Sequence, residues 1–203
     1  MPLQARSKVT VDAIHDATIQ VLRKTGEHGL TTAQVAERAG VSVGTLYQYF
    51  PHKQALMFAA LERHMNALAV ALEDMCQRNR GNGIDVIAQE LAIGYINLKI
   101  ARAKDRSLFY AVVTGLKMDR KRRSISARID LAVAGLLLSA ADAQFDDAFE
   151  TAAILMRGMR IVMRAAIEYP QNLPPVDSLH SELSLFARNY LRSSAHGSRQ
   201  LRC

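Results

Sequence analysis

Apolar residues recur every three to four positions along most of this chain, which is the spacing of amphipathic helices. A candidate N-cap at Thr10, with Asp12 in the first turn, marks the start of the first helix, and Gly26 marks its end. Pro51 separates two short segments from a longer one. The N-terminal part is therefore expected to hold four helices, at about residues 10–26, 32–39, 43–49 and 53–78.

The apolar pattern resumes after Gly81-Asn82-Gly83, a sequence that is typical of a loop. Asp147 and Glu150 have the spacing of a capping box at the start of a further helix, and prolines interrupt the pattern at 170–175. The expected helices lie at about residues 84–103, 106–117, 122–141, 147–168 and 178–193. The pattern thus predicts an all-α fold of about nine helices.

Composition agrees with a helical protein that has a sizeable core, since 49% of the residues are hydrophobic and helix formers dominate. The sequence lacks an uninterrupted apolar run of about 18 residues, the length that a membrane helix needs. Its first residues also lack the apolar run and cleavage site of a signal peptide. We therefore expect a cytoplasmic protein with no membrane partner.

The polar chemistry of the chain does not favour a metal centre or an enzyme. Cys76 and Cys203 stand far apart without a CxxC pattern, and the six histidines are scattered singly. The GxSxG and HExxH motifs and a phosphate-binding glycine loop are also missing from the sequence. No metal, no cofactor and no catalytic residue is expected.

The net charge of +7 favours an acidic partner but does not show where that partner binds. Residues 1–55 carry six Lys/Arg against four Asp/Glu, and the rest of the chain carries twenty against fifteen. The densest basic run, at 117–123, is interpreted as a solvated helix start or loop, with a second nucleic-acid contact as the alternative. The location of a nucleic-acid site must come from the sequence pattern.

The two short helices have the features of a helix-turn-helix. Thr31 and Gln34 form a capping box at the start of the first, and Gly40 permits a tight turn after it. Val41 can pack between the two helices while Ser42 caps the second. Small residues at the start of that second helix would let its backbone approach a DNA groove.

The segment TTAQVAERAGVSVGTLYQYFPHKQAL, at residues 31–56, resembles the TetR family of transcriptional regulators. The resemblance covers about residues 10–56 and implies a dimeric regulator that binds a pseudo-palindromic operator in double-stranded DNA. It implies that DNA phosphates are held by Thr32, Tyr47, Tyr49 and Lys53. It also implies that the residues facing the major groove are Ser42, Val43, Gly44, Thr45 and Gln48.

Elementary chemistry agrees with these roles without requiring them. Gln48 can pair bidentately with adenine, and Lys53 stands at a helix N-terminus, where unpaired amides and an ammonium group favour phosphate. Tyr47 and Tyr49 can instead be half-buried core residues, and Lys53 an ordinary solvated lysine. His52 departs from the family, which commonly has a small capping residue there, so the cap of the fourth helix is expected to be weaker.

Three domains follow: residues 1–52 as the helix-turn-helix domain, 53–195 as a ligand-binding and dimerisation domain, and 196–203 as a disordered tail. Apolar stripes at helical spacing predict a four-helix dimer seam, although the same stripes would also suit intramolecular core. The residues predicted for the seam are Phe149, Met156, Met163, Leu179, Leu183, Phe186 and Tyr190.

A small-molecule effector is the third expected partner, and mainly apolar walls with a few polar tips suit an apolar or amphipathic compound. Each wall residue can equally be core filler. The residues predicted for this pocket are His64, Leu68, Tyr95, Leu98, Phe109, Tyr110, Val113 and Leu136. The favoured function is a repressor released from its operator by ligand, and the alternatives are a ligand-responsive activator and a non-specific architectural DNA-binding protein.

Overall fold

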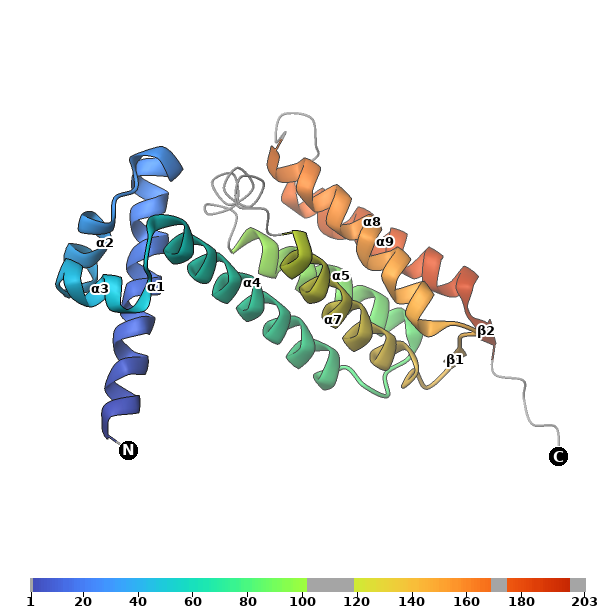
Figure 1. The fold of residues 1–203 in the computed structure, drawn as a ribbon. Helices are drawn as coiled ribbons and strands as arrows, with labels where there is room; N and C mark the ends of the chain where they lie inside the picture. Colours follow the sequence, from blue (N-terminus) through green and yellow to red (C-terminus); the bar gives the residue numbers. More distant parts are fainter. Residues whose placement is uncertain (1, 102–118, 169–174, 198–203) are drawn as a thin grey trace. The chain divides into compact units, whose positions relative to one another are not determined.

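The computed structural model describes residues 2–101, 119–168 and 175–197 and shows an all-α protein in these ranges (Figure 1). Eight helices and one two-stranded ribbon are formed within the described residues. The helices are α1 (Pro2–Gly29), α2 (Thr32–Ala39), α3 (Val43–Tyr49), α4 (Lys53–Arg78), α5 (Ile84–Ile100), α7 (Asp119–Leu137), α8 (Ala148–Glu168) and α9 (Val176–Ser194). The ribbon pairs β1 (Ala143–Gln144) with β2 (His196–Gly197) in antiparallel orientation.

The predicted bounds of α2, α3 and α4 are confirmed to the residue. α1 begins well before the predicted N-cap Thr10. At Gly26 the backbone is non-helical (φ 70°, ψ 179°) and separates two helices that the bounds of α1 join across a kink, which agrees with the predicted end of the first helix near Gly26. The helix expected at 106–117 lies outside the described residues. The strands β1 and β2 were not expected, and β2 takes up the first two residues of the predicted tail, so those two are ordered.

The described chain divides into two compact units, and the division lies inside α4. The first unit comprises residues 1–67 and 104–122, and the second comprises 68–103 and 123–203. The sequence analysis placed this boundary at residue 52, ahead of α4. The difference arises because the first half of α4 contributes Leu56 and Leu61 to the core of the helix-turn-helix unit.

The core of the first unit is an apolar cluster to which α1, α2, α3 and α4 all contribute. Ile14, Val35, Leu46 and Leu56, one from each helix, are completely or almost completely buried in it. The seven-residue α3 could not persist alone, but it is held in place because it shares this core with α1, α2 and α4.

A polar contact at the edge of this core joins α4 to α1. The guanidinium of Arg63 donates to the carboxylate of Asp12 and lies 3.4 Å from Nδ1 of His15. The His15 ring also packs against Phe50, with the ring centroids 5.5 Å apart. Its Nε2 is buried without a hydrogen-bond partner among the described residues. Burial, reinforced by the Arg63 charge, lowers the pKa of His15 below its ordinary value of 6.5.

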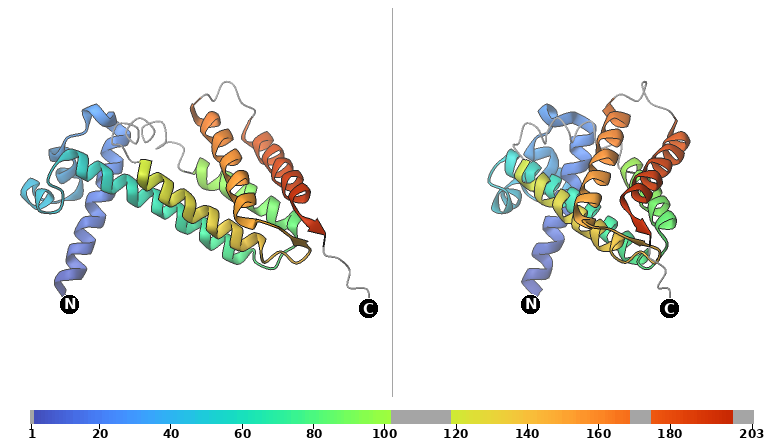
Figure 2. Two further views of the ribbon diagram at one scale, coloured as in Figure 1. Left: turned by 45° about the vertical axis from the view of Figure 1, so that its right-hand side comes forward. Right: turned by 90° about the vertical axis from the view of Figure 1, so that its right-hand side faces the viewer.

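The second unit packs α5 against α9 and places α8 beside α9, as two further views show (Figure 2). Ile87, Leu91 and Tyr95 of α5 are buried in this interior. Asp130 of α7 and Arg160 of α8 form a bidentate ion pair, with Arg160 Nη1 2.9 Å from Asp130 Oδ1. The second half of α4 adds Cys76, whose burial raises the pKa of its thiol to about 11.

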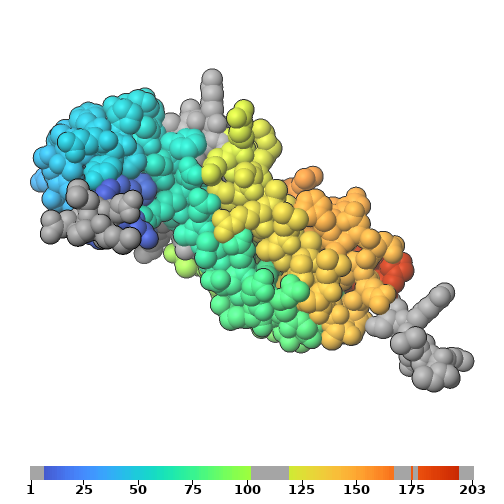
Figure 3. All heavy atoms as spheres, turned by 60° about the horizontal axis from the view of Figure 1, so that its bottom comes forward, coloured from blue at the N-terminus to red at the C-terminus, as the bar shows by residue number. Residues whose placement is uncertain are grey.

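One face of the second unit consists of the C-terminal half of α4 and most of α7, which lie side by side in the space-filling view (Figure 3). Arg128 of α7 donates two hydrogen bonds to the carboxylate of Glu73 on α4. This contact keeps the charged groups of both helices on the outer surface while their apolar sides pack inward.

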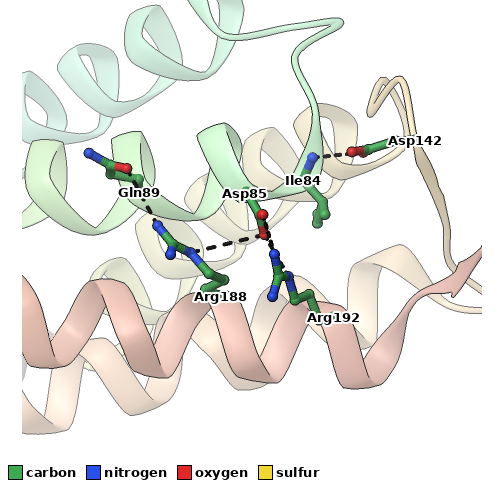
Figure 4. Close-up of polar contacts among 6 residues, drawn as sticks. All are labelled: Ile84, Asp85, Gln89, Asp142, Arg188 and Arg192. Carbon is green, nitrogen blue, oxygen red and sulfur yellow. Dashed lines mark hydrogen bonds and ion pairs between the residues drawn. The ribbon is translucent and has the colours of Figure 1, made fainter.

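Polar groups fasten one end of the second unit (Figure 4). The Ile84 amide at the start of α5 donates to Oδ1 of Asp142 over 2.7 Å, so a residue after α7 supplies the cap that Gly83 cannot. A Cβ at Gly83 would lie 2.8 Å from Asp142 Oδ2, which explains the glycine. Nearby, the hydrogen bond from Arg192 of α9 lowers the pKa of Asp85. The ends of α5 and α9 are thereby tied together.

By length and composition α4 is the one described helix that is apolar enough to cross a membrane. Its charged residues Glu62, Arg63 and Glu73 nevertheless form ion pairs with Lys121, Asp12 and Arg128. Its apolar residues Leu56, Leu61 and Leu72 are fully buried in the protein. Protein packing therefore accounts for part of the apolar character of α4, since 33% of its most apolar stretch is buried.

The lowered pKa of His15 predicts a loss of stability in acid. The native state holds this ring neutral while the unfolded state protonates it near the ordinary value, so stability decreases as pH falls below about 6.5. His15→Gln should lose less stability than the wild type between neutral and mildly acidic pH, measured by urea unfolding followed by circular dichroism. His28→Gln, at an exposed position of α1, is the control and should behave like the wild type. Parallel acid sensitivity in all three proteins would contradict the assignment.

The cap from Asp142 predicts a second effect on stability. Asp142→Ala leaves the Ile84 amide without its acceptor and should lower the free energy of unfolding by about 1 kcal/mol. Asp142→Asn retains an acceptor oxygen at the same place, so its free energy of unfolding should fall much less, as measured by the same urea titration. Equal losses in the two variants would show that the negative charge, and not the capping hydrogen bond, stabilises this end of α5.

Candidate nucleic-acid interface

The first helix of the helix-turn-helix begins with a complete capping box. The Thr31 hydroxyl accepts from the Gln34 amide, and the Gln34 side chain accepts from the Thr31 amide. At the other end, Gly40 takes a φ of 68°, and its amide donates to the carbonyl groups of Ala36 and Glu37. The left-handed conformation at Gly40 turns the chain sharply, and this requirement favours glycine there.

The second helix, α3, is capped at its start and anchored from below. The Ser42 hydroxyl accepts from the Thr45 amide over 2.9 Å. Leu46 is completely buried and Phe50 almost so, and this pair turns one face of α3 toward the core. Tyr47 is 47% exposed, and Gln48 and Tyr49 are exposed as well. Leu46 and Phe50 thus belong to the core, while Tyr47, Gln48 and Tyr49 lie at the surface.

A hydrogen bond between side chains joins the exposed face of α3 to the start of α2. The Thr32 hydroxyl and the Tyr47 hydroxyl lie 3.1 Å apart. Tyr47 is therefore not a core residue, and its ring is held across the surface with the hydroxyl near the N-terminus of α2. Two hydroxyl groups beside free helix amides form an arrangement that suits a phosphate oxygen.

The start of α4 differs from the expectation for its cap. His52 replaces the small capping residue, and its Nδ1 accepts from the Ala55 amide over 3.0 Å. The Leu56 amide donates to the His52 carbonyl in the usual helical pattern. A weaker cap was expected only if nothing replaced the small residue, and here an imidazole nitrogen supplies the acceptor that a Ser or Asn oxygen would have given. Lys53 follows as the first residue of the helix and is half-buried.

All nine residues predicted to contact DNA belong to the first unit, on α2, α3, the Ser42 cap and the first residue of α4, and each is exposed or half-buried. The sequence analysis did not assign His52 to this surface. The signal that could have found it was its position, two residues after buried Phe50 and directly before the first helical residue Lys53.

The residues predicted for a ligand pocket have different environments. Tyr95 and Leu136 are buried in the second unit, where the Lys99 ammonium lies 5.2 Å from the centre of the Tyr95 ring. Leu68 and Leu98 are half-buried in the same unit, and His64 is half-buried in the first. The other three predicted residues, Phe109, Tyr110 and Val113, lie outside the described residues.

Four of the residues predicted for the dimer seam are core residues of the single chain. Met156 and Met163 of α8 and Leu179 and Leu183 of α9 are buried without any partner copy. These side chains are therefore occupied by intramolecular packing, the alternative that the sequence left open. The other three remain at the surface: Phe149 and Phe186 are exposed and Tyr190 is half-buried, and the last two rings stack 6.2 Å apart.

Besides Phe186, the outward side of α8 and α9 carries three exposed apolar residues that were not among those predicted for the seam. Ile161 of α8 is 64% exposed and Leu185 of α9 is 53% exposed. Between the helices, a Cβ at Gly158 would lie 3.1 Å from the Phe186 ring, so that ring rests on the backbone of α8. A surface groove of about 460 Å³ follows this side of α9. We name Ile154, Ile161, Leu185 and Phe186 the outer apolar face.

Comparison with known proteins supports this description of the first unit. The bacterial regulatory proteins of the TetR family match the chain at residues 14–60. The transcriptional repressor KstR of Mycolicibacterium smegmatis is 46% identical over 55 residues, which are 27% of this chain and 27% of KstR. The match thus spans about a quarter of the length of that curated relative and is confined to the helix-turn-helix region.

The whole chain resembles solved structures in fold. A TetR-family transcriptional regulator from Mesorhizobium loti superposes with a TM-score of 0.82 at 19% identity, over 94% of this chain and 99% of that one. The TetR-family repressor AlkX from a Dietzia strain superposes with a TM-score of 0.58 at 23% identity, over 90% and 95%. In sequence, the helix-turn-helix unit of this chain thus matches the TetR family of transcriptional regulators, and in fold the whole chain resembles TetR-family structures.

Proposed function

We propose that this protein is a homodimeric, sequence-specific repressor that leaves a pseudo-palindromic operator when it binds a small apolar or amphipathic ligand. The observation that carries the proposal is the exposed face of α3, where polar and aromatic side chains are held outward by the burial of Leu46 and Phe50. An exposed helix of this kind, with small residues at its start, is suited to the major groove.

Within this surface the roles divide by chemistry. Gln48 offers a donor and an acceptor for an adenine edge, and the methyl groups of Val43 and Thr45 suit thymine. Thr32 and Tyr47, joined by their hydrogen bond, would contact one phosphate, and Lys53 would neutralise another. Base contacts then supply sequence preference, while the phosphate contacts fix the register of α3 on the duplex.

Dimerisation through the outer apolar face would bring two such units onto one operator. Exposed Ile161 and Leu185 lie on neighbouring helices, and their burial against a second copy of the chain would be favourable because it removes apolar surface from water. A two-fold axis at this face makes it self-complementary, and two recognition helices about 34 Å apart read successive major grooves. The second copy is the occupant that both the symmetry and the apolar groove favour.

Release by ligand would act on the second unit. Its interior contributes Leu68, Tyr95, Leu98 and Leu136 as mainly apolar candidates for ligand contact. α4 is one continuous helix whose first part belongs to the first unit and whose second part belongs to the second unit. A ligand that binds more tightly to one position of α4 can therefore shift the population between conformations that bind DNA well and poorly. The sign of regulation rests on the likeness of the helix-turn-helix unit to the repressor KstR. Cytoplasmic location follows from the same proposal.

The DNA-reading role predicts the outcome of selection from a random-sequence pool of duplexes at moderate salt. The wild type should enrich an inverted repeat, and Gln48→Ala should enrich a repeat with relaxed preference at one position per half-site, since about 1–3 kcal/mol of base discrimination is lost. Gln54→Ala, an exposed glutamine on α4, is the matched control and should select the wild-type repeat. Salt-dependent binding without any enriched sequence would instead indicate an architectural DNA-binding protein.

The dimer role predicts that a charge on the outer apolar face separates the subunits. Leu185→Glu would bury two carboxylates at a symmetric seam and should weaken dimerisation by about a hundredfold or more, measured by sedimentation equilibrium. Leu131→Glu, at a similarly exposed leucine of α7, is the control and should leave the dimer intact. Dissociation by Leu131→Glu with a stable Leu185→Glu dimer would place the seam elsewhere.

A further inference from the structure

We propose that His52 is a further DNA-positioning residue, which caps α4 with one ring nitrogen and donates a neutral hydrogen bond to a DNA phosphate with the other. This inference deepens the proposed function and rests on it. The residue departs from the small capping residue that is common in the TetR pattern, so its role does not follow from the resemblance. The observation behind it is the hydrogen bond from the Ala55 amide to His52 Nδ1 at 3.0 Å.

The capping bond fixes the tautomer of the ring. Nδ1 accepts a hydrogen bond and therefore carries no proton, so the neutral imidazole of His52 has its proton on Nε2. The side chain is exposed, and within the part of the chain that the structure describes Nε2 has no hydrogen-bond partner. A donor of known identity is thus available to an external acceptor at the start of α4.

The same bond changes what the end of α4 can offer to a phosphate. The Ala55 amide is occupied by Nδ1, and the Leu56 amide is occupied by the His52 carbonyl. Pro51 supplies no amide proton on the preceding side. The Nε2 N–H of exposed His52 is therefore a further donor at this end of α4, which the cap leaves available.

The neighbouring residues on the interface determine what kind of acceptor fits. Lys53 supplies a positive charge beside the ring, and Tyr49 is exposed one turn earlier in the chain. A phosphate oxygen can accept from both Lys53 and His52 Nε2, since phosphates take several donors at once. The cap requires an unprotonated Nδ1, so the hydrogen bond to the phosphate is donated by the neutral ring. It therefore adds no ionic contact to the one made by Lys53.

The test separates capping from donation with substitutions in the full-length protein. An Asn at position 52 provides an acceptor for the Ala55 amide and also an N–H donor on the same side chain. A Ser provides the acceptor, but its hydroxyl is too short to replace the imidazole N–H as a donor. An Ala provides neither group. The midpoint temperature of thermal unfolding should be close to that of the wild type for His52→Asn and His52→Ser, and it should be lower for His52→Ala. Binding is then measured on a mixed-sequence duplex, because a phosphate contact does not require the operator sequence.

At about pH 7.5, His52→Asn should bind within about twofold of the wild type and His52→Ser about three- to tenfold more weakly, the range of one neutral hydrogen bond. The slope of log affinity against log salt should be the same for these three proteins. Lys53→Gln is the positive control, and it should reduce that slope by about 0.9, the value for one phosphate.

Two results would overturn the inference. If His52→Ser binds as tightly as the wild type, His52 is a cap and nothing more. If His52→Ser reduces the salt slope by as much as Lys53→Gln does, the ring binds as a cation, which the capping geometry does not allow. Failure of DNA binding itself looks different, since neither the wild type nor Lys53→Gln would then show salt-dependent binding to the duplex. Failure of sequence-specific binding alone would show as the absence of an enriched repeat in the selection experiment and would leave this comparison valid.

Discussion

The burial of Leu46 and Phe50 is the contact on which the DNA-binding surface depends. α3 has seven residues, fewer than a helix needs to persist in water, so its shape and its position come from the core beneath it. Leu46 is completely enclosed by a cluster to which α1, α2 and α4 contribute. Once those two side chains are fixed, the helical period leaves Tyr47, Gln48 and Tyr49 no direction except outward.

The polar ends of the helices then set how precisely this surface is presented. Thr31, Ser42 and His52 each accept a hydrogen bond from an amide that the helix itself cannot satisfy. Thr31 is adjacent to Thr32, which is predicted to contact DNA, Ser42 is itself among the predicted residues, and His52 directly precedes Lys53, another of them. Capping and recognition therefore use the same few residues, and a substitution that affects one will usually affect the other.

Local features were predictable from the sequence, and features that depend on distant partners were not. The bounds of α2, α3 and α4 follow from neighbouring capping and breaking residues. The dimer residues did not follow in the same way, because α8 is apolar on two sides: Met156 and Met163 face its own chain, while Ile161 faces solvent. Periodicity finds apolar positions but does not say which of two apolar sides packs internally. The cap from Asp142 to α5 spans 58 residues and had no sequence signal.

The two apolar sides of α8 have a consequence for how the molecule could be regulated. The methionine side is fixed by the packing of one chain, so it contributes to the stability of the second unit whatever the partner does. The outer apolar face is exposed in the single chain, so its side chains leave water, and contribute favourable free energy, only when this face associates with another surface. If the chain dimerises as proposed, the stability of the second unit and the affinity of the dimer are carried by different residues, and a ligand in the interior can alter the first without contacting the residues that determine the second.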